Sequence, residues 1–152
     1  MIDAILAEFL QSGLGIHVGT RDGRLEPCGC RATALKVEDD GKHAVVYVPK
    51  AAAPQIFENL RTNGRVAISM ARPADERAVQ VKGLMLFSWD AKSDEEAFAR
   101  VQWAGFLGQL EGIGLPGAAT SSWQVFPCVA VRLKVTAVFN QTPGPDAGAA
   151  LP

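Results

Sequence analysis

The sequence predicts a mainly β protein, folded as a small six-stranded antiparallel barrel with peripheral helices. Two observations lead to this prediction. Strand-like runs, alternating in polarity or rich in β-branched residues, recur along most of the chain, and only three segments look helical. Short turn signals such as Asp22-Gly23 and the segment EDDGK join several of these runs, and such turns favour antiparallel pairing. A doubly wound parallel sheet would instead need a helix between successive strands.

The elements are expected in the order helix, three strands, helix, two strands, helix, strand. The first helix places Ile2, Ile5, Leu6, Phe9 and Leu10 on one face, and Gly13 ends it. The second helix accepts Pro54 in its first turn, where a missing N–H costs little. The expected strands cover residues 15–21, 30–37, 43–49, 65–72, 78–89 and about 123–139, and the first two helices cover 2–11 and 51–63.

The third helix is predicted to begin at Ser93. The run Ser93-Asp94-Glu95-Glu96 matches a capping box, in which the serine and a glutamate three residues later satisfy free N–H groups of the first turn. The apolar residues that follow predict which side of this helix is buried. They are Ala97, Phe98, Val101 and Leu107.

Length and charge limit the organisation and the partners of the protein. The chain has 152 residues, which suits one domain over residues 1–141, and the Gly/Pro/Ala-rich segment 142–152 is expected to be a flexible tail. The net charge of −1 gives no electrostatic reason to expect nucleic acid or a membrane surface as a partner. No apolar run could span a bilayer and the N-terminus does not resemble a signal peptide, so we expect a cytoplasmic protein with reduced thiols.

Cys28 and Cys30 lie one residue apart and could face one metal ion from a strand. A structural zinc site needs four ligands, and the remaining candidates, Cys128, His17 and His43, form no second pair. The cysteines are therefore interpreted as small packing residues, and no metal is predicted. His17 could be a haem ligand or a proton donor, but it is interpreted as a polar strand residue.

Between Gly15 and Trp89 the chain carries the segment RATALK, a strand ending VYVP, a helix ending LRTNGRVAIS and the strand VQVKG. In this order of motifs it resembles the FMN-binding split barrel of the pyridoxamine 5'-phosphate oxidase family. The resemblance implies a homodimer in which FMN lies between the strands of one protomer and side chains of the other. It also implies that Arg31 holds the FMN phosphate, and a guanidinium fork does match phosphate oxygens.

Other cofactor contacts are implied by the same resemblance. The backbone of Ala32 to Ala34 would lie beside the flavin ring, and Lys50 stands near a position where the family carries a phosphate-binding threonine. Arg77 and Gln80 flank the position from which relatives reach the partner's flavin, and this position is Ala78 here. The whole set is Arg31, Ala32, Thr33, Ala34, Lys36, Val48, Lys50, Arg77, Gln80 and Trp123.

The chain departs from the family where the second helix begins. The family's phosphate-binding cluster falls on Pro54, Gln55 and Ile56, so its serine and lysine counterparts are missing. The sequence is therefore consistent with two functions. One is an FMN-dependent oxidoreductase acting on a small molecule, with haem or a deazaflavin as alternative cofactors; the other is a non-enzymatic ligand or haem carrier or sensor. The sequence assigns no catalytic residue.

Overall fold

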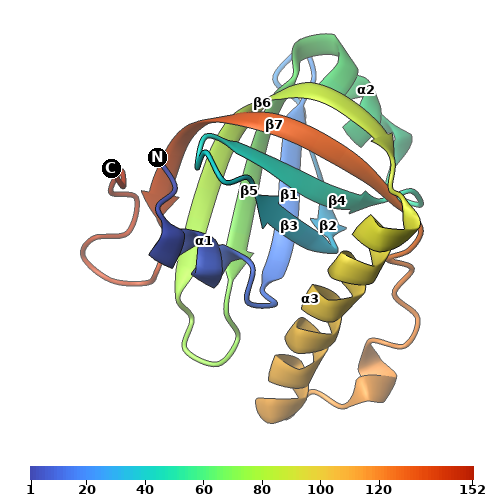
Figure 1. Ribbon diagram of the computed structural model, residues 1–152, viewed down its shortest axis with the longest axis vertical. Coiled ribbons are helices and arrows are strands. Elements are labelled where there is room, and N and C mark those ends of the chain that lie inside the picture. Colours follow the sequence, from blue (N-terminus) through green and yellow to red (C-terminus); the bar gives the residue numbers. More distant parts are fainter.

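Seven strands form one antiparallel sheet that curls around an apolar interior, and three α-helices pack against it (Figure 1). The computed structural model describes residues 1–152. The helices are α1 (Ala4–Leu10), α2 (Pro54–Asn63) and α3 (Ser93–Gly112), with a 3₁₀ turn, η1, at Gly117–Ala119. The strands are β1 (Gly15–Arg21), β2 (Pro27–Ala32), β3 (Ala34–Val37), β4 (His43–Pro49), β5 (Arg65–Ala71), β6 (Ala78–Asp90) and β7 (Cys128–Asn140).

The strand order β2-β1-β5-β6-β7-β4-β3 places two strands that are neighbours in sequence at opposite edges of the sheet. The expectation of one strand over residues 30–37 is therefore wrong: β2 pairs with β1, β3 pairs with β4, and Thr33 joins them. Thr33 is 1% exposed, and its N–H donates to the carbonyl oxygen of Tyr47 at 2.9 Å. This split raises the strand count from the expected six to seven.

The interior of the curled sheet holds the main hydrophobic core. A cluster of 22 buried residues includes Ile16 from β1 and Ile68 from β5, and α2 adds Ile56. A second, smaller cluster lies on the other face of β4, where Tyr47 packs with Ala99 of α3. The fold is thus held mainly by apolar side chains, each worth about 1.5–3 kcal/mol when fully buried.

Two glutamines cover the exposed edge of β3. Gln102 of α3 accepts a hydrogen bond from the Leu35 N–H at 3.1 Å and donates to the Leu35 carbonyl at 2.8 Å, much as a neighbouring strand would. Gln11 accepts from the Val37 N–H at 3.1 Å. Because unpaired edges invite pairing with other chains, these contacts close β3 to strand addition.

Three expectations about element ends and faces need correction. The last strand begins at Cys128, since residues 113–127 form a loop that contains η1. Ser93 is the first helical residue and Lys92 is the N-cap. The Lys92 N–H donates to the Glu95 carboxylate, whereas the expected capping box paired Ser93 with Glu96. Val101, expected to be buried, is 74% exposed.

The buried side of α3 is instead formed by Ala99, Gln102 and Phe106. In α1 the expected apolar face holds for Phe9 and Leu10, whereas Ile5 is 75% exposed.

Residues 142–152 turn back along β7. The Leu151 N–H donates to the Val138 carbonyl at 2.8 Å, and the N-terminal ammonium of Met1 donates to the Pro152 carbonyl at 2.6 Å. The two termini therefore lie together, as Figure 1 shows. None of the helices combines the length and the apolar character that crossing a membrane requires.

Candidate functional site

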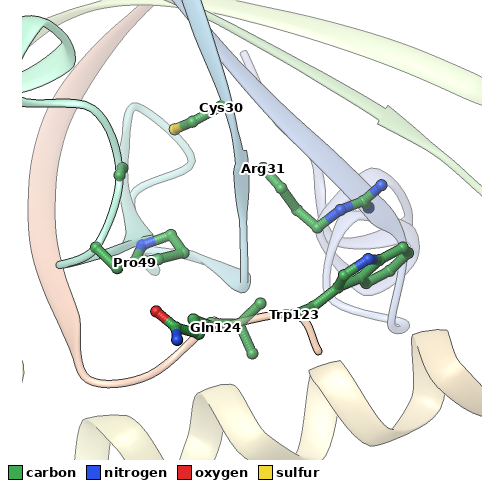
Figure 2. Close-up of a pocket in the computed structure, with 8 residues that line it drawn as sticks. Cys30, Arg31, Pro49, Trp123 and Gln124 are labelled. Carbon is green, nitrogen blue, oxygen red and sulfur yellow. The ribbon is translucent and has the colours of Figure 1, made fainter. Parts of the chain in front are cut away.

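The predicted arginine lines a pocket beside β2, one of the two edge strands of the sheet. The pocket has a volume of about 350 Å³, and β2, the end of β4, the loop before α2 and the loop before β7 contribute to its walls. Its lining residues are Cys30, Arg31, Pro49, Ala51, Ala52, Trp123, Gln124 and Val125. Figure 2 shows Cys30 and Arg31 projecting to opposite sides of β2.

Arg31 is a half-buried cation without an anionic partner. Its guanidinium carbon lies 4.4 Å from the centroid of the Trp123 ring and 5.3 Å from that of Phe106, so the charge is stacked on aromatic rings. No carboxylate lies within 4.0 Å of it, and its Nη1 is buried without any hydrogen-bond acceptor. Burial lowers the pKa of Arg31, although arginine stays protonated in proteins.

An unpaired buried donor carries a desolvation penalty of about 1–3 kcal/mol, and more for a charged group. A phosphate or carboxylate oxygen bound at Nη1 would remove this penalty and neutralise the charge. Figure 2 shows the guanidinium beside the Trp123 indole at one end of the pocket. The site therefore suits a ligand that combines an anionic group with an apolar body.

A row of polar side chains continues from Arg31 across the sheet. His17 pairs with Arg31, Ser69 pairs with His17, and Gln80 pairs with Ser69, to which it donates a hydrogen bond at 3.1 Å. Partial burial and then the charge of Arg31 lower the pKa of His17, so its imidazole is neutral at pH 7. The fold thus aligns Gln80 with Arg31, about 14 Å away across three strand spacings.

The three residues whose backbone is expected to flank a flavin do not line the pocket. Ala32, Thr33 and Ala34 are at most 1% exposed. The Thr33 hydroxyl donates to the carbonyl of Val125, a pocket residue, at 2.9 Å. Thr33 therefore ties the junction of β2 and β3 to the loop before β7, which carries Trp123.

Four other expected cofactor residues do not converge with Arg31. Val48 is fully buried in the core, and the Lys36 ammonium lies 5.9 Å from the centroid of the Phe98 ring of α3. Lys50 is adjacent in sequence to the pocket residues Pro49 and Ala51, but its ammonium pairs with Asp90 at 3.0 Å. Arg77 stacks on Phe9, with its guanidinium carbon 4.0 Å from the ring centroid.

The start of α2 supplies no cationic side chain to the pocket. Pro54 begins the helix without an N–H, Ile56 is fully buried, and the Gln55 amide donates to Asn59. Arg31 is therefore the one cation that lines this pocket.

Sequence reasoning did not assign Cys30, Phe106 or Val125 to the site. Adjacent strand residues point to opposite faces of a sheet, so the sequence carried no signal that would place Cys30 in the same pocket as Arg31. Burial, with a smaller effect of the Cys28 thiol, raises the pKa of Cys30 to about 11, so its thiol is protonated at neutral pH. The cysteines are free, and none belongs to the cluster of possible metal ligands, which is Glu38, Asp40 and His43.

Comparison with known proteins gives a likeness in fold. No protein-family profile and no curated protein matches the sequence. Among solved structures, HupZ of Group A Streptococcus is 18% identical, with a TM-score of 0.57 over 97% of this chain and 100% of that one. An F420 reductase is 19% identical, with a TM-score of 0.58 over 86% of this chain and 94% of that one.

An FMN-binding protein from Syntrophomonas wolfei is 14% identical, with a TM-score of 0.55 over 90% of this chain and 86% of that one. The chain therefore has the split-barrel fold found in FMN-binding proteins similar to pyridoxamine 5'-phosphate oxidase. At these identities the likeness concerns the fold alone, and it supports the resemblance first seen in RATALK and VQVKG.

Proposed function

We propose that this protein binds FMN, or a related phosphorylated flavin, and acts as an oxidoreductase on a small molecule. The Arg31 guanidinium is the observation that carries the proposal. It lies half-buried in the lining of a pocket, has no anionic partner, and its buried Nη1 has no hydrogen-bond acceptor. The fold is shared with an FMN-binding protein and an F420 reductase, which makes a flavin the favoured anionic ligand.

The residues present fit such a group. Arg31 would hold a phosphate oxygen, and Ala51, Ala52 and Val125 offer apolar contact to a ring. A bound flavin would supply hydride or electron transfer, while the chain supplies anchoring and a partly dry slot. Single-arginine anchoring predicts weaker binding than a site with several phosphate donors, because each charge-assisted hydrogen bond contributes about 1.5–3 kcal/mol.

We further propose a homodimer. The pocket volume of about 350 Å³ lies near the lower end of the usual range for ligand sites, roughly 300–1,000 Å³, so a second protomer would enlarge the enclosure. Leu86 and Phe87 of β6 are 44% and 53% exposed and offer apolar surface for such a contact. Sedimentation velocity tests this: a monomer at all concentrations would contradict it.

The second candidate function is a non-enzymatic binding protein of the same fold, a carrier or sensor for a ligand such as haem. It is favoured by the start of α2, where Pro54 and Ile56 occupy the positions of phosphate donors and Lys50 is held by Asp90. Such a protein would keep the pocket but would not retain FMN.

Absorption and fluorescence titrations separate the two functions. Purified protein is titrated with FMN and, separately, with haemin. Saturable quenching of flavin fluorescence with a shift of the visible flavin bands supports the first function. A Soret band with haemin and no flavin response supports the second function. If FMN binds, turnover is tested with reduced nicotinamide cofactors as electron donors.

A further inference from the structure

A second hollow lies on the outer face of the sheet and shares no residue with the Arg31 pocket. Its volume is about 560 Å³, and strands β1, β5, β6 and β7 form it. The lining residues are Gly19, Thr20, Arg21, Arg65, Val66, Ala67, Lys82, Gly83, Leu84 and Thr136.

Three of these residues are cations and none is acidic. Arg21, Arg65 and Lys82 have no carboxylate within 4.0 Å. Arg21 donates one hydrogen bond to the backbone carbonyl of Asp22, and the Lys82 ammonium lies 5.0 Å from the centroid of the Phe139 ring. The net charge of the chain is −1, so this local excess of positive charge does not follow from composition.

Strand pairing brings the three cations together. Gly19 pairs with Ala67, and Ala67 pairs with Lys82, so these positions form one row across β1, β5 and β6. Arg21 lies two residues after Gly19 and Arg65 two residues before Ala67, which places them opposite each other on antiparallel strands. Like charges opposite each other on neighbouring strands destabilise a sheet.

Small residues form part of the wall of the hollow, and β6 is irregular beside it. Gly19 and Ala67 line it with no side chain larger than a methyl group, so they leave space between the longer side chains around them. The register of β6 against β7 shifts between Lys82 and Gly83. A Cβ atom at Gly83 would lie 2.5 Å from Leu133 Cδ1 and 2.7 Å from the Lys134 carbonyl, so only glycine permits this close approach of the strands.

We propose that this hollow binds a phosphate-bearing small molecule, independently of the proposed flavin site. Arg21 and Arg65, at opposite positions on β1 and β5, each carry a guanidinium fork that matches the oxygens of a phosphate, and Lys82 supplies a third positive charge. An anion bound among them replaces mutual repulsion with charge-assisted hydrogen bonds. The concave shape suits a small molecule of limited size.

Calorimetric titration of the full chain with inorganic pyrophosphate at low ionic strength tests the proposal. We expect saturable binding that falls about tenfold or more in Arg65→Gln and in Lys82→Gln, since each change removes charge-assisted hydrogen bonds. Lys42→Gln is the control, because it removes the same charge from an exposed turn outside the hollow. It should change the affinity less than twofold.

The Arg31→Ala variant separates this proposal from the flavin site. Pyrophosphate binding should persist in it, and FMN binding should persist in Arg65→Gln and Lys82→Gln. Circular dichroism and thermal unfolding confirm that each variant is folded. Absence of pyrophosphate binding, an equal loss in Lys42→Gln and Lys82→Gln, or loss in Arg31→Ala alone would overturn the proposal.

Discussion

The guanidinium carbon of Arg31 lies 4.4 Å from the centroid of the Trp123 ring, and the two residues come from β2 and from the loop before β7. Trp123 also packs against Trp103 of α3, with ring centroids 5.9 Å apart. The indole thus holds the cation that lacks an anionic partner and links it to the helix that covers the β3 edge.

Replacing Trp123 with leucine should destabilise the protein. The change removes a partly desolvated cation–π contact and an aromatic pair, together worth about 1–3 kcal/mol of unfolding free energy. Urea denaturation of the variant and of Trp123→Phe measures this. The phenylalanine variant keeps a ring beneath the guanidinium and should lose less than half as much; equal losses would show that the ring does not hold Arg31.

Gln102→Leu should cost about 2–4 kcal/mol of unfolding free energy. Gln102 is 5% exposed and satisfies both backbone groups of Leu35, and leaving two buried polar groups unpaired costs about 1–3 kcal/mol each. Val101→Leu is the matched control on the exposed side of α3 and should change stability by less than about 0.5 kcal/mol. Similar losses in both variants would refute the edge-capping role of Gln102.

Gly83→Ala should destabilise the sheet by about 1–3 kcal/mol, because the added methyl group meets Leu133 and the Lys134 carbonyl. Gly108→Ala is its control. Nothing lies within 4 Å of a Cβ atom at this helical position, so alanine there should stabilise the protein by up to about 1 kcal/mol. Thermal unfolding of both variants gives opposite shifts if the close approach of β6 and β7 is as described.

The Glu38–Arg132 pair should make stability depend on pH in the acid range. A bidentate hydrogen bond from Arg132, with both N–O distances 2.7 Å, lowers the pKa of Glu38 below its ordinary value of 4.5. A carboxylate whose pKa is lower in the folded state stabilises that state above the unfolded pKa, and this contribution is lost as pH falls through the folded pKa.

Wild type and Glu38→Gln are therefore compared by urea denaturation between about pH 7 and about pH 3. The stability difference between them should be constant at the upper end and should shrink below pH 4.5. A difference that stays the same over the whole range would contradict the role assigned to this pair.

The sequence predicted the class of fold and most strands because alternation and turn signals are local. The break at Thr33 was missed because residues 30–37 form a continuous strand-like run, and the change of partner from β1 to β4 depends on curvature of the whole sheet. The buried side of α3 was missed for a related reason, since Gln102 is polar and is buried through hydrogen bonds to β3.

For the candidate site, the sequence singled out Arg31 and Trp123, which the structure brings together, although it could not indicate that their side chains stack. It also indicated that Pro54 and Ile56 offer no phosphate donor, and their geometry agrees. Lys36, Lys50 and Arg77 were expected from their positions in the family's motifs, but each contacts a partner outside the pocket.

The affinity for FMN of wild type, Arg31→Gln and Arg24→Gln, measured by quenching of flavin fluorescence, tests the central claim most directly. Arg24 lies exposed in the turn between β1 and β2, outside the pocket, and its replacement removes the same charge. We predict saturable FMN binding that weakens by about tenfold to a hundredfold in Arg31→Gln, equivalent to about 1.4–2.8 kcal/mol, and changes less than twofold in Arg24→Gln. No binding by wild type, or equal affinities in wild type and Arg31→Gln, would contradict the account.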